Sequence, residues 1–406
     1  MKALTNPYTP NAGAEPQAVV GRDDQLELFD HLLARIERGK TEQSMIITGL
    51  RGVGKTVLLG QFRAKADRHN WVVVEMEVNK SDDSDFRQLI ATKLRGALFE
   101  LSPKAKWTDR FKRAGSVLRS FTVKLEESGA WSAGLDVDIA EGVADHGDLS
   151  LDLTDLFIAI GEAANEKDRG VVLLFDEIQF LNRVQLEAII AALHKMVQRK
   201  LPVTLVGAGL PQIAELAGDA KSYAERLFKF PSIDNFDAKD AKSALQEPAK
   251  DEDAYFTSDA LNRAIAVTGG YPYFLQELGY AVWTVAEGPL ITADDVELAL
   301  PAYQAKLDES FFRVRLNRST ELQKAYLRAM AELGPEPQKA ADVAEVMGRT
   351  SQNIAPTRAE LINMGLLYTP DHGFAAFTVP HFDQFLKRAI PTLTIPEPRR
   401  RQTKKK

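Results

Sequence analysis

One run of residues in this sequence has the types and spacing that suit phosphate binding. It reads GLRGVGKT and matches the pattern G-x-x-x-x-G-K-[ST]. The glycines let backbone N–H groups wrap around phosphates, Lys55 reaches the outer phosphates, and the Thr56 hydroxyl ligates Mg²⁺. An apolar stretch precedes the run and helical spacing follows it, which favours a working site over a chance match. The residues expected to bind the ligand are Gly49, Leu50, Arg51, Gly52, Val53, Gly54, Lys55, Thr56 and Val57.

A second run, GVVLLFDEIQF, supplies the acidic groups that such a site needs. Asp176 is expected to hold Mg²⁺ through water, and Glu177 to act as general base on the attacking water. A carboxylate at the end of a buried strand is common, so the pair gains its meaning from the phosphate loop upstream. The adjacent Asp-Glu pair favours hydrolysis over phosphoryl transfer to a substrate, which weighs against a small-molecule kinase.

The composition indicates what kind of protein carries these residues. The chain has 406 residues, 45% apolar and 27% charged, which suggests two or three domains. It has no cysteine, which excludes disulfides and thiolate metal sites. The sequence shows neither a signal peptide nor a run near the roughly 18 apolar residues of a membrane span. We therefore expect a cytoplasmic protein that does not bind membranes.

The elements that hold the two motifs follow from hydrophobic patterning. Four short apolar, β-branched runs alternate with helical spacing, which predicts parallel strands joined by crossover helices in a doubly wound α/β sheet. These runs are residues 44–49, 71–78, 170–177 and 201–209. The stretch 81–168 is unusually long, and an insertion around 100–150 is predicted, with a β-hairpin around Ser128–Gly129 and a helix that starts near Thr154.

The rest of the chain reads as two smaller domains and a tail. Helical periodicity from about residue 238 to 312 predicts a small bundle. Residues 317–398 read helix, short helix, helix and two short strands around His372–Gly373, the order of a winged helix-turn-helix. Residues 399–406 form a basic tail, predicted to be disordered.

These motifs resemble the AAA+ superfamily, in the branch shared by initiator-type (origin-recognition-like) ATPases and STAND signalling NTPases. The resemblance implies a P-loop (ASCE/AAA+) parallel sheet in residues 1–232, a helical lid in 233–316, and ATP with Mg²⁺ as ligands. The stretch VVGRDDQL is similar to the box that contacts adenine in that branch, which assigns Val20, Gly21 and Arg22 to the base. The alternative is a helix N-cap followed by a solvated arginine.

Two further positions bear on the nucleotide in the family. A polar residue after the second strand can restrain the catalytic glutamate, and Asn79 falls there, although Asn also favours plain strand-ending turns. The family's first sensor usually offers Asn, Thr or Ser, but this chain has Gly207, Ala208 and Gly209. The run GAGLPQIAELA instead resembles the Gly-x-Pro variants of transposition-helper ATPases.

The resemblance also implies one residue that acts between subunits and one in the lid. Arg226 falls where the family carries an arginine finger, which would stabilise the transferred phosphoryl group on a neighbouring subunit and make hydrolysis depend on a homo-oligomer. The alternative is an arginine that is solvated or paired with Glu225. The lid run GGYPYF carries Pro272 in a G-x-P motif similar to that of STAND NTPases, in which the proline packs beside the nucleotide.

The winged helix has two candidate partners, double-stranded DNA and protein. Its polar positions could contact bases and phosphates or form a solvated face. Residues 317–398 hold eight Lys or Arg against nine Asp or Glu, so their net charge of −1 lacks the basic footprint of a DNA-binding domain. The candidate DNA contacts are Arg349, Ser351, Gln352, Asn353, Thr357 and Arg358.

Two functions fit this sequence. The first is an ATP-dependent switch with low ATPase turnover that oligomerises and acts on DNA. The second is a STAND-like signalling or scaffold NTPase whose winged helix binds protein partners.

Overall fold

The computed structural model describes residues 3–11, 13–122, 135 and 137–397. These residues form two compact units, which are described separately. The sheet unit comprises residues 11–49 and 53–240, and the helical unit comprises residues 3–10, 50–52 and 241–397.

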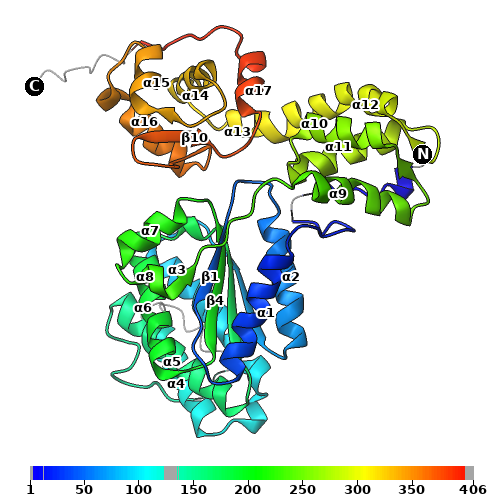
Figure 1. Cartoon of the computed structure of the whole chain (residues 1–406). Coiled ribbons are helices and arrows are strands. Elements are labelled where there is room, and N and C mark those ends of the chain that lie inside the picture. Colours follow the sequence, from blue (N-terminus) through cyan, green and yellow to red (C-terminus); the bar gives the residue numbers. More distant parts are fainter. Residues whose placement is uncertain (1–2, 12, 123–134, 136, 398–406) are drawn as a thin grey trace, which may run out of the picture. The chain divides into compact units, whose positions relative to one another are not determined.

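A five-stranded parallel sheet forms the centre of the sheet unit (Figure 1), with the strand order β2-β3-β4-β1-β5. The four predicted apolar runs form β1 to β4, whereas the two-residue strand β5 was not predicted because so short a segment carries no periodicity. β1 and β4 are buried along their whole length, as strands with both faces covered must be. The strands are β1 (Ser44–Thr48), β2 (Val72–Glu77), β3 (Val171–Asp176), β4 (Val203–Gly209) and β5 (Phe228–Lys229).

The register of the strands decides which side chains meet at the carboxyl edge of the sheet. Thr48 pairs with Gly209 at the ends of β1 and β4, and Phe175 pairs with Gly207 between β3 and β4. β4 therefore lies between the strand that precedes the phosphate loop and the strand that ends in Asp176. The phosphate loop and the Asp-Glu pair are brought to one edge from strands that are not direct neighbours.

Helices pack on both faces of this sheet (Figure 1), and the apolar sides of the helices from α3 to α8 form one core with the strands. Local signals start several of them; α6, for example, begins with a reciprocal capping box between Asn182 and Gln185. The α-helices are α1 (Asp23–Glu37), α2 (Lys55–Arg68), α3 (Asp83–Leu101), α4 (Asp109–Thr122), α5 (Leu149–Glu166), α6 (Arg183–Arg199), α7 (Ile213–Ala220) and α8 (Ala224–Leu227), with short 3₁₀ turns η2 (Lys104–Lys106) and η4 (Ile178–Phe180).

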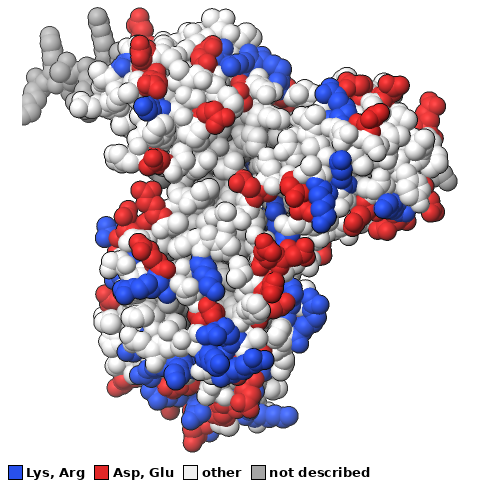
Figure 2. Space-filling view, in the orientation of Figure 1, with Lys and Arg blue, Asp and Glu red and all other residues white. Residues whose placement is uncertain are grey.

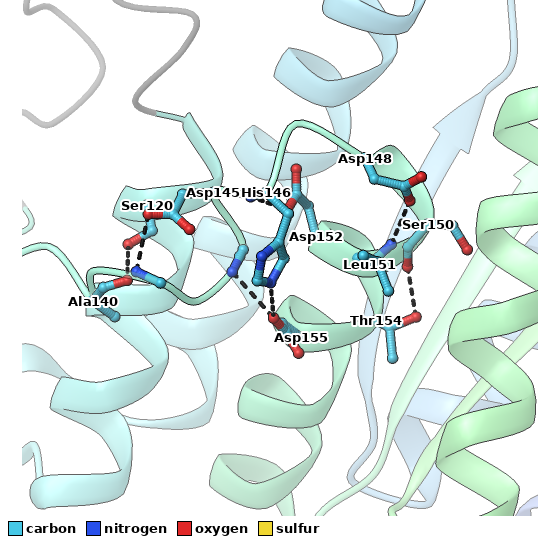
Figure 3. Close-up of polar contacts among 12 residues, drawn as sticks. Ser120, Ala140, Asp145, His146, Asp148, Ser150, Leu151, Asp152, Thr154 and Asp155 are labelled. Carbon is cyan, nitrogen blue, oxygen red and sulfur yellow. Dashed lines mark hydrogen bonds and ion pairs between the residues drawn. The ribbon is translucent and has the colours of Figure 1, made fainter.

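The segment before α5 is held by polar contacts with α4 and α5 (Figure 3). The Ala144 N–H donates to the Asp155 carboxylate at 3.1 Å, and the His146 N–H donates to the buried Asp152 carboxylate at 2.8 Å. The His146 ring lies 3.2 Å from the same Asp155 oxygen. Arg87 on α3 completes the cluster with an ion pair to Asp152 at 2.9 Å. These contacts give residues 140–148 a structural role in closing the core.

One boundary in this segment differs from the sequence-based expectation. α5 begins at Leu149 rather than near Thr154, because the Asp148 side chain accepts the Leu151 N–H at 2.9 Å and caps the helix earlier. The predicted hairpin around Ser128–Gly129 lies outside the described residues.

The first part of the helical unit is a helical bundle with a small parallel β-pair. A π-helix lies near its end, before the last short helix. α9 starts within the sheet unit and continues into this one. The elements are η1 (Ala3–Thr5), α9 (Ala238–Asp251), β6 (Tyr255–Phe256), α10 (Ser258–Thr268), α11 (Pro272–Val285), β7 (Leu290–Ile291), α12 (Ala293–Lys306), the π-helix η5 (Leu307–Phe312) and α13 (Arg313–Leu316).

The last part of the helical unit contains helices and a three-stranded antiparallel sheet in the order β8-β10-β9. α16 begins at Ser351, because the Thr350 hydroxyl caps it by accepting the Asn353 N–H at 3.3 Å. The elements are α14 (Glu321–Leu333), β8 (Gln338–Lys339), α15 (Ala340–Val346), α16 (Ser351–Asn363), β9 (Leu367–Tyr368), β10 (Phe374–Phe377) and α17 (Phe382–Ala389).

Surface charge and hydropathy match an ordinary globular chain. Cations and anions are interspersed on the face shown in Figure 2. Within the described part of the chain, no helix has the length and apolar character required to span a bilayer.

Candidate active site

The phosphate loop connects β1 to α2 in a backbone shape that requires glycine. Gly52 and Gly54 have φ angles of +87° and +95°, in the left-handed region that other residues rarely adopt. At Gly49 the limit is space, because a Cβ atom would lie 2.5 Å from the Ile233 carbonyl oxygen. Gly54 is the residue before α2, so the helix N-terminus, with its unpaired N–H groups, opens directly at the loop.

Lys55 is the first residue after the loop glycines, and its side chain lies within the loop. The Lys55 side chain is buried, with 7% of its surface exposed, and its ammonium group donates to the Gly49 carbonyl oxygen at 2.9 Å. Its charge therefore lies inside the curve of the loop, where phosphate oxygens would be attracted. Val57, on the next position of α2, is half-buried.

Thr56 and Asp176 meet at the edge of the sheet although 120 residues separate them in the sequence. The Thr56 hydroxyl donates to one Asp176 carboxylate oxygen at 2.6 Å, and the other carboxylate oxygen accepts the Glu177 N–H at 2.8 Å. Hydroxyl and carboxylate oxygens are the hard donors that Mg²⁺ prefers. The pair thus fits a magnesium ion that completes its shell with phosphate and water oxygens. No cluster of three or more His, Asp or Glu suited to a metal occurs in the described ranges.

Glu177 is held in an unusual backbone conformation at the tip of β3. Its φ and ψ angles are 51° and 37°, a left-handed conformation that is uncommon for a residue with a side chain. Its carboxylate accepts a hydrogen bond from the side-chain amide of Gln179. A constrained carboxylate beside the Mg²⁺ donors is suited to act as the general base on water.

The Arg22 side chain, which directly precedes α1, holds the phosphate loop through hydrogen bonds. Its guanidinium donates to the Val53 carbonyl oxygen at 3.0 Å and to the Asp234 carbonyl oxygen at 2.9 Å, and it stacks 4.7 Å from the centroid of the Phe236 ring. Burial lowers the pKa of Arg22, and the carboxylates of Asp240 and Asp234 oppose that shift. The side chain thus holds the loop rather than standing solvated, and Val20 and Gly21 precede it with Val20 half-buried.

Asn79, predicted to restrain the glutamate, lies exposed two residues after β2. Within the described ranges it forms no side-chain hydrogen bond, and the restraint on Glu177 comes from Gln179. Residues 79–82 also spell N-K-S-D, the letters of the guanine-recognition pattern N-K-x-D. Here that run has a local structural role, because Asp82 caps α3 by accepting the Asp85 N–H at 2.9 Å.

Gln179 is the site residue that the sequence reasoning missed. It is buried, with 9% of its surface exposed, and its side-chain oxygen accepts the Leu210 N–H at 3.0 Å. Leu210 follows β4, the strand where the family's first sensor lies. The signal available in the sequence was a polar residue two positions after Glu177 in an otherwise apolar run, opposite a strand that ends in Gly207, Ala208 and Gly209.

Arg226, the predicted finger, lies on the short helix α8 with its side chain exposed. Its backbone carbonyl accepts from the Gln43 side chain at 3.1 Å, which fixes the position of the helix. Its guanidinium makes no ion pair with Glu225 or with any other residue that the structure describes. The alternative of a local Glu225 pair therefore does not apply.

Pro272, the predicted lid residue, is the first residue of α11 in the helical unit. The next residue, Tyr273, donates its N–H to the Gly52 carbonyl oxygen at 3.2 Å, and both residues belong to that unit. Tyr271, which precedes the proline, is fully buried and packs on Phe274.

The candidate DNA contacts on and before α16 differ in how exposed they are. Ser351, Gln352 and Asn353 are exposed in the first turn of α16. Arg349 and Arg358 are half-buried, and each donates to a backbone carbonyl, that of Pro396 and that of Phe374 respectively. Thr357 is 6% exposed, so the expectation that it belongs to the polar face is wrong: one turn beyond Asn353, the helix faces the domain interior there.

Two family models match parts of the chain. Residues 18–206 match the AAA ATPase domain family, a range that includes β1 to β3, the first residues of β4, the phosphate loop and the Asp176-Glu177 pair. Residues 309–386 match a domain of unknown function (DUF8462). No protein of curated function matches the chain.

Several solved structures are similar to this chain. The Walker-type ATPase PABY2304 of Pyrococcus abyssi aligns with a TM-score of 0.57 at 15% identity, covering 92% of this chain and 97% of that one. The RuvB Holliday junction branch migration motor of Thermotoga maritima aligns with a TM-score of 0.46 at 17% identity (91% and 95% covered). The Orc1 protein of Aeropyrum pernix, solved in complex with DNA, gives 0.44 at 15% identity (92% and 94% covered). Residues 18–206 match the AAA ATPase domain family, and the five-stranded parallel sheet has the P-loop AAA+ fold.

Proposed function

We propose that this chain is an ATP-binding molecular switch that hydrolyses ATP slowly. The observation that carries the proposal is the meeting of Thr56 with Asp176 at 2.6 Å, beside Lys55 and Glu177, at the edge of the sheet. The match of residues 18–206 to the AAA ATPase domain supports ATP over GTP as the ligand, although the letters N-K-S-D occur at 79–82.

Each residue of the site has a defined task in the proposed reaction. The N–H groups of the loop and the Lys55 ammonium bind the phosphates and offset their charge. Glu177 orients the attacking water and takes up its proton at a carboxylate oxygen. A Mg²⁺ ion, when bound by Thr56 and Asp176 through its oxygen ligands, would supply further charge neutralisation at the phosphates.

Low turnover is proposed because the sensor position of β4 carries only glycine and alanine. Gly207, Ala208 and Gly209 offer no side chain that could hydrogen-bond the terminal phosphate. The guanidinium of Arg226 is exposed and forms no ion pair with a described residue. It would stabilise the charge on the phosphoryl group of ATP bound by a neighbouring copy. We therefore propose that hydrolysis is stimulated in a homo-oligomer.

The remaining parts of the chain are proposed to transmit the nucleotide state. Residues 1–232 would form the base with its insertion around 100–150, 233–316 the lid, 317–398 a winged helix and 399–406 a basic tail. Helices α14 to α16 with the small sheet β8-β10-β9 support the winged helix. Pro272 at the start of α11 would contact the nucleotide from the lid, as the proline of the G-x-P motif does in STAND NTPases. The chain would act in the cytoplasm.

The winged helix has two proposed targets, and double-stranded DNA is the first. Ser351, Gln352 and Asn353 are exposed where a recognition helix enters the major groove. The second target is a protein partner, as in a STAND-like scaffold. It is favoured by the net charge of −1 in residues 317–398 and by the backbone contacts of Arg349 and Arg358.

One experiment separates these functions: ATP turnover and sedimentation measured together, with and without duplex DNA, at two salt concentrations. The switch predicts turnover per subunit that rises with protein concentration, and the DNA form of the proposal predicts stimulation that falls as salt is raised. ATP turnover that does not change with DNA, with protein concentration or in the Arg226→Ala variant would contradict the oligomeric switch. DNA-independent turnover with a retained concentration dependence would favour a protein partner.

A further inference from the structure

The side chain of Gln179 joins the tips of two strands at the candidate active site. Gln179 lies in the 3₁₀ turn η4, which follows Glu177 directly. Its amide nitrogen donates to a Glu177 carboxylate oxygen, and its amide oxygen accepts the Leu210 N–H at 3.0 Å. One buried amide therefore connects the end of β3 to the end of β4.

The glycines of β4 provide the space in which this amide lies. A Cβ atom at Gly209 would lie 2.7 Å from the Gln179 amide oxygen and 3.0 Å from a methyl carbon of Ile178. At Gly207 a Cβ would lie 2.8 Å from the end of the same Ile178 side chain. A larger residue at Gly209 would therefore displace Gln179, so the loss of the expected sensor side chain and the presence of the glutamine are linked.

The contact with Glu177 has a direct chemical consequence. An N–H donor to a carboxylate fixes the direction of its lone pairs. A general base must point at the water that it activates. The residue expected to restrain the glutamate, Asn79, forms no hydrogen bond to it in the described part of the chain. The role therefore falls to a residue on a different element.

We propose that Gln179 is a positioning residue that orients the Glu177 carboxylate for attack on ATP and couples it to the end of β4. The proposal rests on the proposed ATPase function. A movement of β4 on nucleotide binding would pull on Gln179 through the Leu210 N–H, so the same amide would change the orientation of Glu177 with the state of the site.

The first test replaces the amide by an apolar side chain of similar size. In Gln179→Leu we expect kcat to fall at least about tenfold while the Kd for ATP stays within about twofold, because the phosphate loop is untouched. The change should therefore appear in kcat and not in nucleotide binding. Gln185→Leu is the matched control: this glutamine is fully buried and caps α6 but does not contact Glu177. Its substitution should lower stability without lowering kcat.

The second test reaches the same contact from β4. Gly209→Ala should reduce kcat in the wild type, because its Cβ displaces the Gln179 amide, and should have little further effect in the Gln179→Ala background. Gly218→Ala is the control glycine, because a Cβ there meets no atom within 4 Å. Full additivity of the two substitutions would overturn the coupling, even if one variant proved unstable.

The outcomes distinguish this inference from the proposed function. A wild type without ATP turnover would refute the proposed function and, with it, the role of Gln179. A wild type that hydrolyses ATP, together with an unchanged kcat in Gln179→Leu, would refute the role of Gln179 alone. A reduced kcat with an unchanged Kd for ATP and non-additive substitutions would support it.

Discussion

At the scale of single residues, the phosphate loop illustrates two separate reasons for glycine. Gly54 has a φ of +95° with no atom within 4 Å of a built Cβ, so only backbone strain excludes a side chain. Gly49 has an ordinary φ, and there a side chain is excluded by the carbonyl of Ile233. The same glycine motif therefore combines a conformational and a steric requirement.

These reasons lead to different costs. Gly54→Ala should lower the free energy of unfolding, measured in urea, by about 1 to 2 kcal/mol. This is the cost of a left-handed conformation for an L-residue. Gly60→Ala, on the exposed side of α2 and also in open space, should be neutral or stabilising by up to about 1 kcal/mol. An equal change in both variants would contradict the role of the φ angle.

Arg22 gives a second residue-scale prediction, because its guanidinium ties the loop carbonyl of Val53 to Asp234. Hydrogen bonds to charged groups contribute roughly 1.5 to 3 kcal/mol when buried. Arg22→Leu should therefore lower the free energy of unfolding by about 2 kcal/mol or more and weaken ATP binding, measured by denaturation and by titration of the nucleotide. Arg38→Leu, at an exposed position after α1, should change neither quantity.

At the scale of elements, the sequence predicted the strong periodic signals and missed the short ones. The runs that form β1 to β4 were predicted because each is apolar and β-branched, and the position of Lys55 at the start of α2 follows from the loop pattern. β5 and β8 have two residues each, too few for a periodic pattern. Gln179 escaped notice because its role depends on the order β3-β4-β1, which brings β4 beside β3 and which no local pattern encodes.

Helix α11 carries the clearest pH-dependent group of the helical unit. Glu277 is 5% exposed and accepts the Tyr273 hydroxyl at 2.6 Å. Burial raises the pKa of Glu277, so its folded-state pKa lies above the unfolded value of about 4.3. The carboxyl therefore stabilises the fold most below the unfolded pKa, and this contribution is lost as pH rises through the folded pKa.

The consequence can be measured with one substitution. Glu277→Gln keeps an acceptor for Tyr273 but cannot ionise, so its melting temperature relative to the wild type should rise as pH increases from about 4.5 to 8. Glu287→Gln, with an exposed side chain in the segment after α11, is the matched control for the loss of one carboxyl group. A melting-temperature difference that does not change with pH in Glu277→Gln would mean that this carboxyl carries no burial penalty.

At the scale of the whole molecule, the proposed switch requires both units to respond to the bound nucleotide. The sheet unit holds Thr56, Asp176 and Glu177, and the helical unit holds Pro272 and the C-terminal helices. The exposed Arg226 adds a proposed contribution from a second copy. Mixing Arg226→Ala with Glu177→Gln subunits should then restore some turnover, because each variant lacks a different half of the shared site. Mixtures no more active than the sum of the separate proteins would contradict a shared site.

The central claim is that Glu177 drives hydrolysis at a site that binds Mg-ATP through the phosphate loop. The most direct measurement compares ATP binding and ATP turnover in the wild type and in Glu177→Gln, with Mg²⁺ present. We predict that turnover falls at least about a hundredfold, as expected when a general base is removed, while the Kd for ATP stays within about twofold. Equal turnover in the two proteins, or a wild type that does not bind ATP, would contradict the account.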